Sequence, residues 1–303
     1  MSKLLVFGTV ALDDIKTPSG TRKDMLGGSA AHFSMSARLF TDVHLVAIVG
    51  KDFPKRYLAF LRNKGIELSS LAIGEGKTFH WEGEYKKENL NQAITHATEL
   101  GVLAGTAPEV APHQRGIPQV FLANIDPDMQ MGLLNSMHKP RLVGLDSMNL
   151  WINIKKPSLM KLMKRVDLFV ANDGEARSLS GENNLIKSAK FLRRCGPKLI
   201  VVKKGEHGVL FYSDDFFFSF PAYPIETVLD PTGAGDTFAG GLMGYLSRSA
   251  KLNLTILKKA VTYATITASF NVQGFGMEKT SALTMAAVNK RMREFIHYVS
   301  PGK

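Results

Sequence analysis

The fold of this chain is constrained most by a regular alternation of short apolar runs with helical segments. From about residue 119 the strand-like runs are Val120 to Leu122, Arg141 to Leu145, Asp167 to Val170 and Lys198 to Val202, and Leu4 to Val10 is an earlier one. Strands buried on both faces read as continuous apolar runs, and repeated strand–helix units place their strands in parallel. The sequence therefore predicts an α/β fold with a doubly wound, mostly parallel sheet and helices on both faces.

Two segments interrupt this alternation. Asp14 to Met25 is polar and rich in turn residues, while Ile73 to Val102 carries Phe79, Trp81 and Tyr85 at every second position. Alternation with period two indicates strands with one covered face. We interpret residues of about 14–25 and 73–102 as a small β lid over a cleft, and a partly buried edge hairpin is the alternative. The whole chain, 1–303, is interpreted as a single domain.

Composition limits the class of protein. With 303 residues, 45% of them hydrophobic, the chain is long enough for one large core. Cys195 is the only cysteine, so neither an internal disulfide nor a cysteine-based zinc cluster can form. The first apolar run is too short for a signal peptide, and no run approaches the ~18 apolar residues of a membrane span. We therefore expect a cytoplasmic protein without a membrane partner.

The net charge of +11 is high enough to suggest a nucleic-acid partner. The basic residues are dispersed, however, and no nucleic-acid motif accompanies them. We interpret the charge as a solvated surface that attracts anionic nucleotides, and we expect no dedicated nucleic-acid partner.

A glycine-rich turn runs directly into an amphipathic helix near the C-terminal third of the chain. Gly233, Ala234 and Gly235 form the turn, and Asp236 follows in the first helical turn. Free N–H groups and the helix dipole at such a helix start attract an anion. A carboxylate there can accept a proton from a hydroxyl lying in front of it. A plain acidic N-cap would explain one Asp and one Gly, but not three small residues in a row.

The stretch from Asp230 to Met243 resembles the C-terminal signature of the ribokinase family, also called the PfkB carbohydrate kinases. In that family the turn is the anion hole for the transferred phosphate and the Asp is the catalytic base. The resemblance assigns these roles to Gly233, Ala234, Gly235 and Asp236. It also implies a ribokinase-like fold, ATP as co-substrate, Mg²⁺ and, in some members, activation by a monovalent cation.

The acceptor side is expected near the first strand. Asp13 follows that strand, at the edge where open α/β sheets bind ligands, although a loop aspartate capping a turn reads the same way. Its spacing from Gly27 and Gly28 resembles the sugar-binding aspartate and di-glycine turn of the family. His32 stands where many relatives carry an Asn that grips the sugar. The imidazole of His32 can still form hydrogen bonds with a substrate, but this difference from the relatives leaves the identity of the phosphate acceptor open.

Asn172 and Glu175 have two interpretations. They form an Asn-x-x-Glu capping box, and they also resemble the family motif that organises magnesium and phosphate through water. The two roles are compatible because Mg²⁺ usually keeps several waters. The resemblance thus makes Asn172 a nucleotide-side residue and Glu175 a water-mediated metal ligand. Asp146, after an earlier strand, resembles a family position with altered spacing, and we interpret it as structural.

Two further turns resemble the nucleotide side of the family. The strand ending at Lys203 runs into a turn at Gly205, and Lys203 and Lys204 replace residues that are usually small or apolar. Two interpretations stay open: Lys203 contacts a phosphate group, or both lysines are simply solvated at the end of a strand. The loop containing Asn271 and Gly274 resembles the one that flanks adenine, and Gly274 also fits a helix C-cap.

These observations predict an ATP- and Mg²⁺-dependent phosphotransferase acting on a hydroxyl, expected to be a hydroxymethyl, of a sugar. A nucleoside kinase is the alternative, because Phe79, Trp81 and Tyr85 could stack on a base. A noncatalytic sugar- or nucleotide-binding regulator is more distant, since Asp236 and the full glycine turn are present. Lids pair into homodimers in some branches of the family, and a homodimer through the lid is left open.

Overall fold

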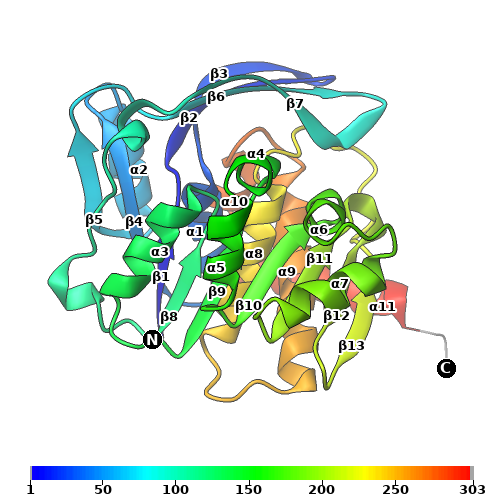
Figure 1. The fold of residues 1–303 in the computed structure, drawn as a ribbon. Helices are drawn as coiled ribbons and strands as arrows, with labels where there is room; N and C mark the ends of the chain where they lie inside the picture. The colour runs from blue at the N-terminus through cyan, green and yellow to red at the C-terminus, as the bar shows by residue number, and fades with distance from the viewer. Residues whose placement is uncertain (1, 301–303) are drawn as a thin grey trace.

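The computed structural model describes residues 2–300 and has a nine-stranded sheet at its centre (Figure 1). The strand order from edge to edge is β13-β12-β11-β10-β9-β8-β1-β4-β5. All neighbours from β11 to β5 pair in parallel, whereas β12 and β13 are antiparallel. The strands are β1 (Lys3–Phe7), β4 (Asp42–Gly50), β5 (Glu67–Gly74), β8 (Gln119–Leu122), β9 (Leu142–Asp146), β10 (Leu168–Asn172), β11 (Leu199–Lys203), β12 (Val209–Tyr212) and β13 (Phe217–Phe220). The predicted doubly wound, mostly parallel sheet is confirmed.

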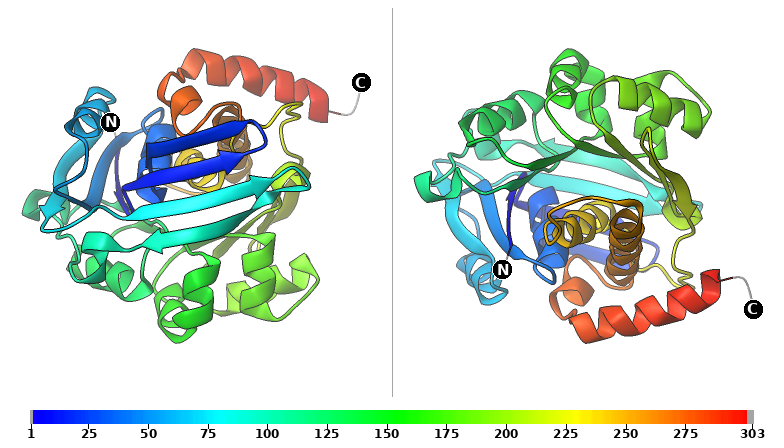
Figure 2. Two further views of the ribbon diagram at one scale, coloured as in Figure 1. Left: turned by 90° about the horizontal axis from the view of Figure 1, so that it is seen from above. Right: turned by 90° about the horizontal axis from the view of Figure 1, so that it is seen from below.

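Helices cover both faces of this sheet (Figure 2). In β1, Leu4 and Val6 point into one core while Leu5 and Phe7 point into the other, as expected for a strand buried on both sides. The first core is covered by α1 (Ser29–Ala37), α2 (Lys55–Asn63), α8 (Ala234–Leu246) and α9 (Leu254–Asn271). The second is covered by α3 (Pro127–Ser136), α4 (Asn149–Ile154), α5 (Lys156–Met163), α6 (Asp173–Ser180) and α7 (Leu185–Arg194). The short α10 (Glu278–Ser281) and α11 (Met285–Val299) follow α9.

Helices α1 and α8 pack unusually closely because α8 carries glycines at the contact. A Cβ atom on Gly240 would lie 2.2 Å from the Phe33 carbonyl oxygen, and one on Gly244 would lie 3.0 Å from Ala37. Every residue of α1 is buried. This close packing brings His32, on α1, against the start of α8.

A second sheet stands over the carboxyl ends of the main strands (Figures 1 and 2). Its strand order is β3-β2-β6-β7, formed by β2 (Ala11–Thr17), β3 (Gly20–Gly27), β6 (His80–Lys86) and β7 (Asn89–Glu99). The parallel pairing of β2 with β6 joins two segments far apart in the sequence. Both segments that interrupt the predicted alternation thus lie in one four-stranded sheet, and β2 begins earlier than expected.

One local detail differs from the sequence-based expectations. Pro54 fits the first helical position in the sequence pattern, but it has extended backbone and is the N-cap of α2. None of the helices in the part of the chain between residues 2 and 300 combines the length and the apolarity that crossing a lipid bilayer requires.

Candidate active site

The glycine turn opens helix α8 as the sequence pattern predicts. Gly233 is the N-cap with φ of 71°, a left-handed conformation that glycine adopts without strain. The Ala234 N–H donates to the Pro231 carbonyl at 3.1 Å. Within residues 2–300, the N–H groups of Gly233 and Gly235 have no protein acceptor. Those two amides are therefore the donors available to an anion in front of the helix.

Asp236 lies in the first turn of α8, beside this anion turn. Burial raises the pKa of its carboxyl group, while the neighbouring His32 and Lys203 lower it. A carboxylate at this place is set to accept a proton from a group held at the helix start.

Three neighbouring strands end in polar residues at the same edge of the sheet. Asp146 is the last residue of β9, Asn172 of β10 and Lys203 of β11. Asp146 is 3% exposed, one of its carboxylate oxygens has no hydrogen-bond partner, and burial raises its pKa well above the usual range. Asp146 was interpreted as structural from the sequence, and its position at a carboxyl strand end is the same signal that pointed to Asp13.

Asn172 and Glu175 form the predicted capping box at the start of α6. The Glu175 N–H donates to the Asn172 side-chain oxygen at 2.7 Å, and the Asn172 N–H donates to a Glu175 carboxylate oxygen, also at 2.7 Å. Burial raises the pKa of Glu175, and Lys203 lowers it. The capping box uses only one of the two carboxylate oxygens, so the cap leaves the other for a further ligand.

Lys203 extends from β11 toward the anion turn. Its Nζ lies 2.6 Å from the position that a Cβ atom on Gly235 would take. The absent side chain of Gly235 therefore leaves room for an ammonium group directly beside a free amide donor.

Asp13 lies on β2 and is 4% exposed. A Cβ atom on Gly27 would lie 1.8 Å from its carboxylate, so the glycine makes room for this side chain. Burial raises the pKa of Asp13 to about 8, whereas a hydrogen bond from the Gly28 N–H lowers it and the nearby Asp230 and Asp236 raise it further. The di-glycine turn and the aspartate are therefore one local unit, as the family resemblance implies.

His32 lies between the acceptor side and the anion turn. It is 1% exposed, and its ring lies 2.3 Å from the position of a Cβ atom on Gly233. Neither ring nitrogen has a hydrogen-bond partner. Burial lowers the pKa of His32, while the nearby Asp236 and Asn271 raise it, and the burial favours a neutral imidazole with one nitrogen that donates and one that accepts.

The inner face of the second sheet carries aromatic side chains. Trp81 pairs with Asp13 across β6 and β2, and its ring lies 2.1 Å from the position of a Cβ atom on Gly83. The glycine thus allows the indole to lie flat on the sheet. Burial raises the pKa of Tyr85, and Thr232 of the anion turn lies beside its phenol. The sequence pattern predicts the shared face of these aromatics but not the contact of Tyr85 with the turn.

Phe79 does not belong to this aromatic wall. It precedes β6 and packs against the second core. Of the three aromatics proposed for base stacking, only Trp81 and Tyr85 are available on the strand itself.

The turn after β11 meets the tip of the second sheet. Gly205 has φ of 55°, and Asn91 of β7 lies against it. The Asn91 side-chain amide donates to the Glu206 carboxylate. Sequence reasoning missed this contact, because nothing in a local motif pairs two surface residues that are 115 positions apart.

Asn271 ends α9 and is bonded within the protein. Its Nδ2 donates to the Thr232 carbonyl at 2.7 Å and its Oδ1 accepts from the Thr237 hydroxyl at 2.9 Å. It therefore ties the helix end to the anion turn. Gly274, expected as the C-cap, is not in the left-handed region, because α9 ends through Val272 and the positive φ belongs to Gly276 at 52°.

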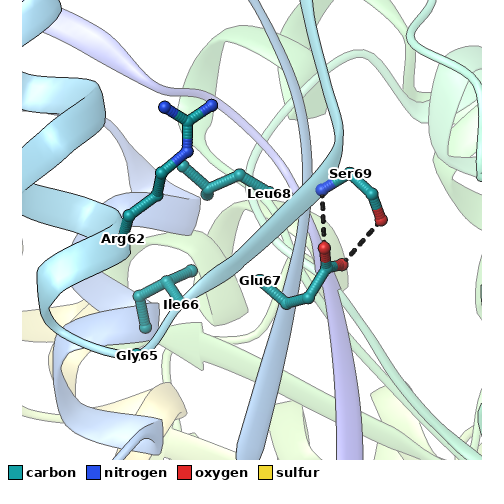
Figure 3. A pocket seen from close by; sticks show the side chains of 6 residues that line it. All are labelled: Arg62, Gly65, Ile66, Glu67, Leu68 and Ser69. Carbon is teal, nitrogen blue, oxygen red and sulfur yellow. Dashed lines mark hydrogen bonds between the residues drawn. The ribbon is translucent and has the colours of Figure 1, made fainter.

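A separate surface depression of about 570 Å³ is lined by Arg62 and residues 65–69 (Figure 3). Glu67 accepts hydrogen bonds from the Ser69 N–H at 2.9 Å and from its hydroxyl at 2.8 Å. The depression lies at the amino end of β5, away from the carboxyl edge where open sheets bind ligands. We do not assign it a role in catalysis.

Comparison with known proteins identifies the family of this chain. Residues 134–283 match the family described as pfkB family carbohydrate kinase. A cytidine kinase of Thermococcus kodakarensis is 35% identical over 258 residues, which are 83% of this chain and 91% of that protein. The crystal structure of Methanocaldococcus jannaschii nucleoside kinase superimposes with a TM-score of 0.77 at 22% identity, over 97% of this chain and 99% of the other. A ribokinase from Cryptococcus neoformans in complex with ADP gives 0.80 at 20% identity, over 96% and 100%.

The chain belongs to the pfkB family of carbohydrate kinases. It is an ATP-dependent kinase of a sugar or a nucleoside, and the family prediction made from the glycine turn is confirmed.

Proposed function

We propose that the acceptor of this kinase is a nucleoside, and specifically a pyrimidine nucleoside such as cytidine. The observation that carries this choice is the flat indole of Trp81, which pairs across strands with the buried Asp13. Aromatic faces stack on bases, whereas a plain sugar needs hydrogen bonds but little aromatic area. The similarity to a cytidine kinase supports the same class of acceptor.

Asp13 and His32 bind the acceptor in this proposal, with Gly27 and Gly28 shaping the turn around them. An ionised Asp13 accepts hydrogen bonds from two ribose hydroxyls at once. His32 has two buried, unpartnered ring nitrogens, and a buried polar group without a partner costs about 1–3 kcal/mol. A ligand that hydrogen-bonds this imidazole removes that cost, so His32 favours acceptors with a polar group at its position.

Phosphoryl transfer takes place at the start of α8. Asp236 orients the acceptor hydroxyl and takes its proton late, since a carboxylate cannot deprotonate an alcohol in advance. The amides of Gly233 and Gly235 hold the transferred phosphate, and Ala234 shapes the turn. Water is excluded when the sheet of β2, β3, β6 and β7 covers the cleft as a lid.

The residues at the ends of β9 and β10 fit a magnesium ion held through water. The buried, unpartnered oxygen of Asp146 and the second carboxylate oxygen of Glu175 are hard oxygen donors of the kind Mg²⁺ takes. When bound, Mg²⁺ would supply charge neutralisation at the phosphates. The reciprocal hydrogen bonds of Asn172 and Glu175 keep the Glu175 carboxylate in place.

The nucleotide side is assigned to Lys203, Gly205 and the loop from Asn271 through Gly274. Gly205 begins a tight turn with positive φ, and Asn271 fixes the loop to the anion turn. A stimulating monovalent cation is part of the proposal. Its support is the buried Thr232 beside the buried Asp230 carboxylate, since both side chains offer oxygen atoms to a cation.

A homodimer through the lid is proposed as a second property, to be tested by sedimentation at several concentrations. The outer face of the lid satisfies its own charges, since Glu84 pairs with Lys16 at 3.1 Å and with His96 at 2.9 Å. Strands β3 and β7, at the edges of the sheet, are the parts left for pairing.

The cytoplasmic location inferred from the single cysteine stays a prediction.

The decisive experiment measures ADP release from Mg·ATP with cytidine, uridine, adenosine, inosine, ribose and fructose. We expect kcat/KM to be highest for a pyrimidine nucleoside. Equal or higher kcat/KM with free ribose or fructose would overturn the choice of acceptor and return the assignment to a sugar kinase.

A further inference from the structure

Lys203 lies at the point where the polar strand ends and the anion turn meet. It is the last residue of β11 and pairs with Asn172 of β10 across the parallel register. The side chain is half-buried. Its backbone is held within the sheet, so the point from which the side chain extends is fixed.

The side chain of Lys203 runs along the position that a Cβ atom on Gly235 would occupy. That position lies 2.6 Å from Nζ, 3.6 Å from Cε and 4.0 Å from Cδ. The ammonium is therefore placed beside the unpaired N–H of Gly235. An anion bound by that amide would also receive hydrogen bonds from Nζ.

Three carboxylates surround this ammonium without pairing with it. Lys203 lowers the pKa values of Asp146, Glu175 and Asp236. Yet among residues 2–300 no carboxylate oxygen lies within 4.0 Å of its Nζ, and no hydrogen bond joins it to the protein. The donors of this ammonium are therefore not used within the described part of the protein, and an anionic ligand that takes them would gain charge-assisted hydrogen bonds.

We propose that Lys203 is a catalytic residue that binds the γ-phosphoryl group of ATP during its transfer. This inference rests on the proposed kinase function and adds a group that acts on the reacting phosphorus centre. The ammonium donates hydrogen bonds to non-bridging oxygens and keeps its protons throughout. The bond from the γ-phosphorus to the bridging oxygen breaks to release ADP, a bond to the acceptor oxygen forms, and the acceptor proton goes to Asp236.

A structural role makes a different prediction. If Lys203 only neutralised the three carboxylates, its removal would lower stability and affect ATP and ADP binding alike. If it binds the γ-phosphoryl group, its removal weakens ATP selectively, because ADP has no such group. The ratio of the two affinities therefore separates the two roles.

The test compares Lys203→Met with Lys198→Met, which removes the same charge at the residue just before the same strand begins. Isothermal titration without acceptor measures ADP and a non-hydrolysable β,γ-methylene ATP analogue, each with Mg²⁺. We expect Lys203→Met to weaken the analogue at least tenfold more than ADP, and to lower kcat by about 10²–10³-fold, the range for loss of one preorganised donor. Lys198→Met should match the wild type in both measurements.

Lys203→Arg keeps the charge and moves the donors, so it covers the case in which the methionine variant fails to fold. It should retain ADP affinity and lose kcat to an intermediate degree. Wild-type kcat in either folded Lys203 variant, or equal loss of ADP and analogue affinity, would overturn the inference. A wild-type protein that binds both nucleotides but phosphorylates no sugar or nucleoside would instead contradict the proposed acceptor.

Discussion

The two halves of the cleft are built in different ways. The proposed phosphoryl side consists of backbone amides at one helix start and of side chains at the ends of three neighbouring strands. The acceptor side gathers Asp13 from β2, His32 from α1 and Trp81 and Tyr85 from β6. The first half thus depends on short local motifs, and the second on side chains brought together by a sheet of distant segments.

This difference separates the groups proposed to bind phosphate from those proposed to select the acceptor. Backbone amides bind any phosphate and do not depend on the identity of the acceptor. His32, Trp81 and Tyr85 are side chains that can be exchanged without altering the anion turn. Changes on the phosphoryl side should therefore lower kcat for every acceptor, while changes on the acceptor side should alter KM and selectivity.

The largest effect is expected for Asp236→Asn. The amide keeps the shape of the first turn of α8 but cannot accept the acceptor proton, so kcat should fall by about 10²–10⁴-fold. Affinities for nucleotide and acceptor, measured by titration, should stay close to wild type. A kcat near the wild-type value would remove Asp236 from the role of base.

The next effect is expected for Asp13→Ala on the opposite side. Loss of the carboxylate leaves ribose hydroxyls unpaired, at a cost of about 1–3 kcal/mol, so KM for the acceptor should rise about tenfold to a hundredfold. ATP affinity should not change. Titration showing unaltered acceptor affinity would make Asp13 a turn residue and would end the contrast between the two halves.

The pH dependence follows from the raised pKa of Asp13, about 8. Below that pH the carboxyl group is mostly protonated, and the form that accepts two hydroxyl hydrogen bonds is scarce. Acceptor affinity should therefore rise about tenfold between pH 7 and pH 9 and level off above it. Asp14, Asp230 and Asp236 face the same region and all raise this pKa.

The control for this pH profile is Asp13→Asn, which has no titrating group at that position. Its acceptor affinity should be flat across the same range. A slope that survives in Asp13→Asn would assign the titration to another group in the cleft.

Trp81→Leu should have a smaller and more selective effect. Loss of stacking costs about 0.5–1.5 kcal/mol, so kcat/KM for a pyrimidine nucleoside should fall about twofold to tenfold. Activity on free ribose should be unchanged, because ribose has no base. Equal losses of kcat/KM for both acceptors would indicate that Trp81 stabilises the lid rather than stacks on the base.

The smallest effect is expected for Asn91→Ala, at the exposed contact with Glu206. An exposed hydrogen bond to a charged group contributes little net free energy, so kcat/KM should change by no more than about threefold. Gln92→Ala, at the next and likewise exposed position of the same strand, is the matched control. A loss above tenfold in Asn91→Ala alone would show that the lid tip determines turnover.

The sequence predicted the phosphoryl side well because its information is local. The run from Gly233 to Asp236 contains both the turn and the proposed base. Asn172 and Glu175 together form the complete capping box. The main sheet was predictable for the same reason, since strands buried on both faces are apolar throughout. For Asp146 the sequence favoured a structural interpretation, because one acidic residue after a strand does not show what lies around it.

The acceptor side was less predictable because its contacts are long-range. The alternation in residues 79–85 predicted a covered face, but only the parallel pairing of β2 with β6 places Trp81 beside Asp13. The exclusion of Phe79 from that face depends on core packing. Likewise, the room that Gly235 leaves for Lys203 is visible only when β11 and α8 are placed together.

The hydrogen bond between Asn91 and Glu206 joins the proposed lid over the acceptor to the turn that we assign to the nucleotide side. Asn91 belongs to the β6–β7 hairpin, and Glu206 to the turn that begins at Gly205. A displacement of either element is therefore felt at both ends of the cleft. Thermodynamic reciprocity then applies to the two substrates: whatever factor the acceptor adds to nucleotide affinity, the nucleotide must add to acceptor affinity. Synergy between ligands in this enzyme can be read from either titration alone.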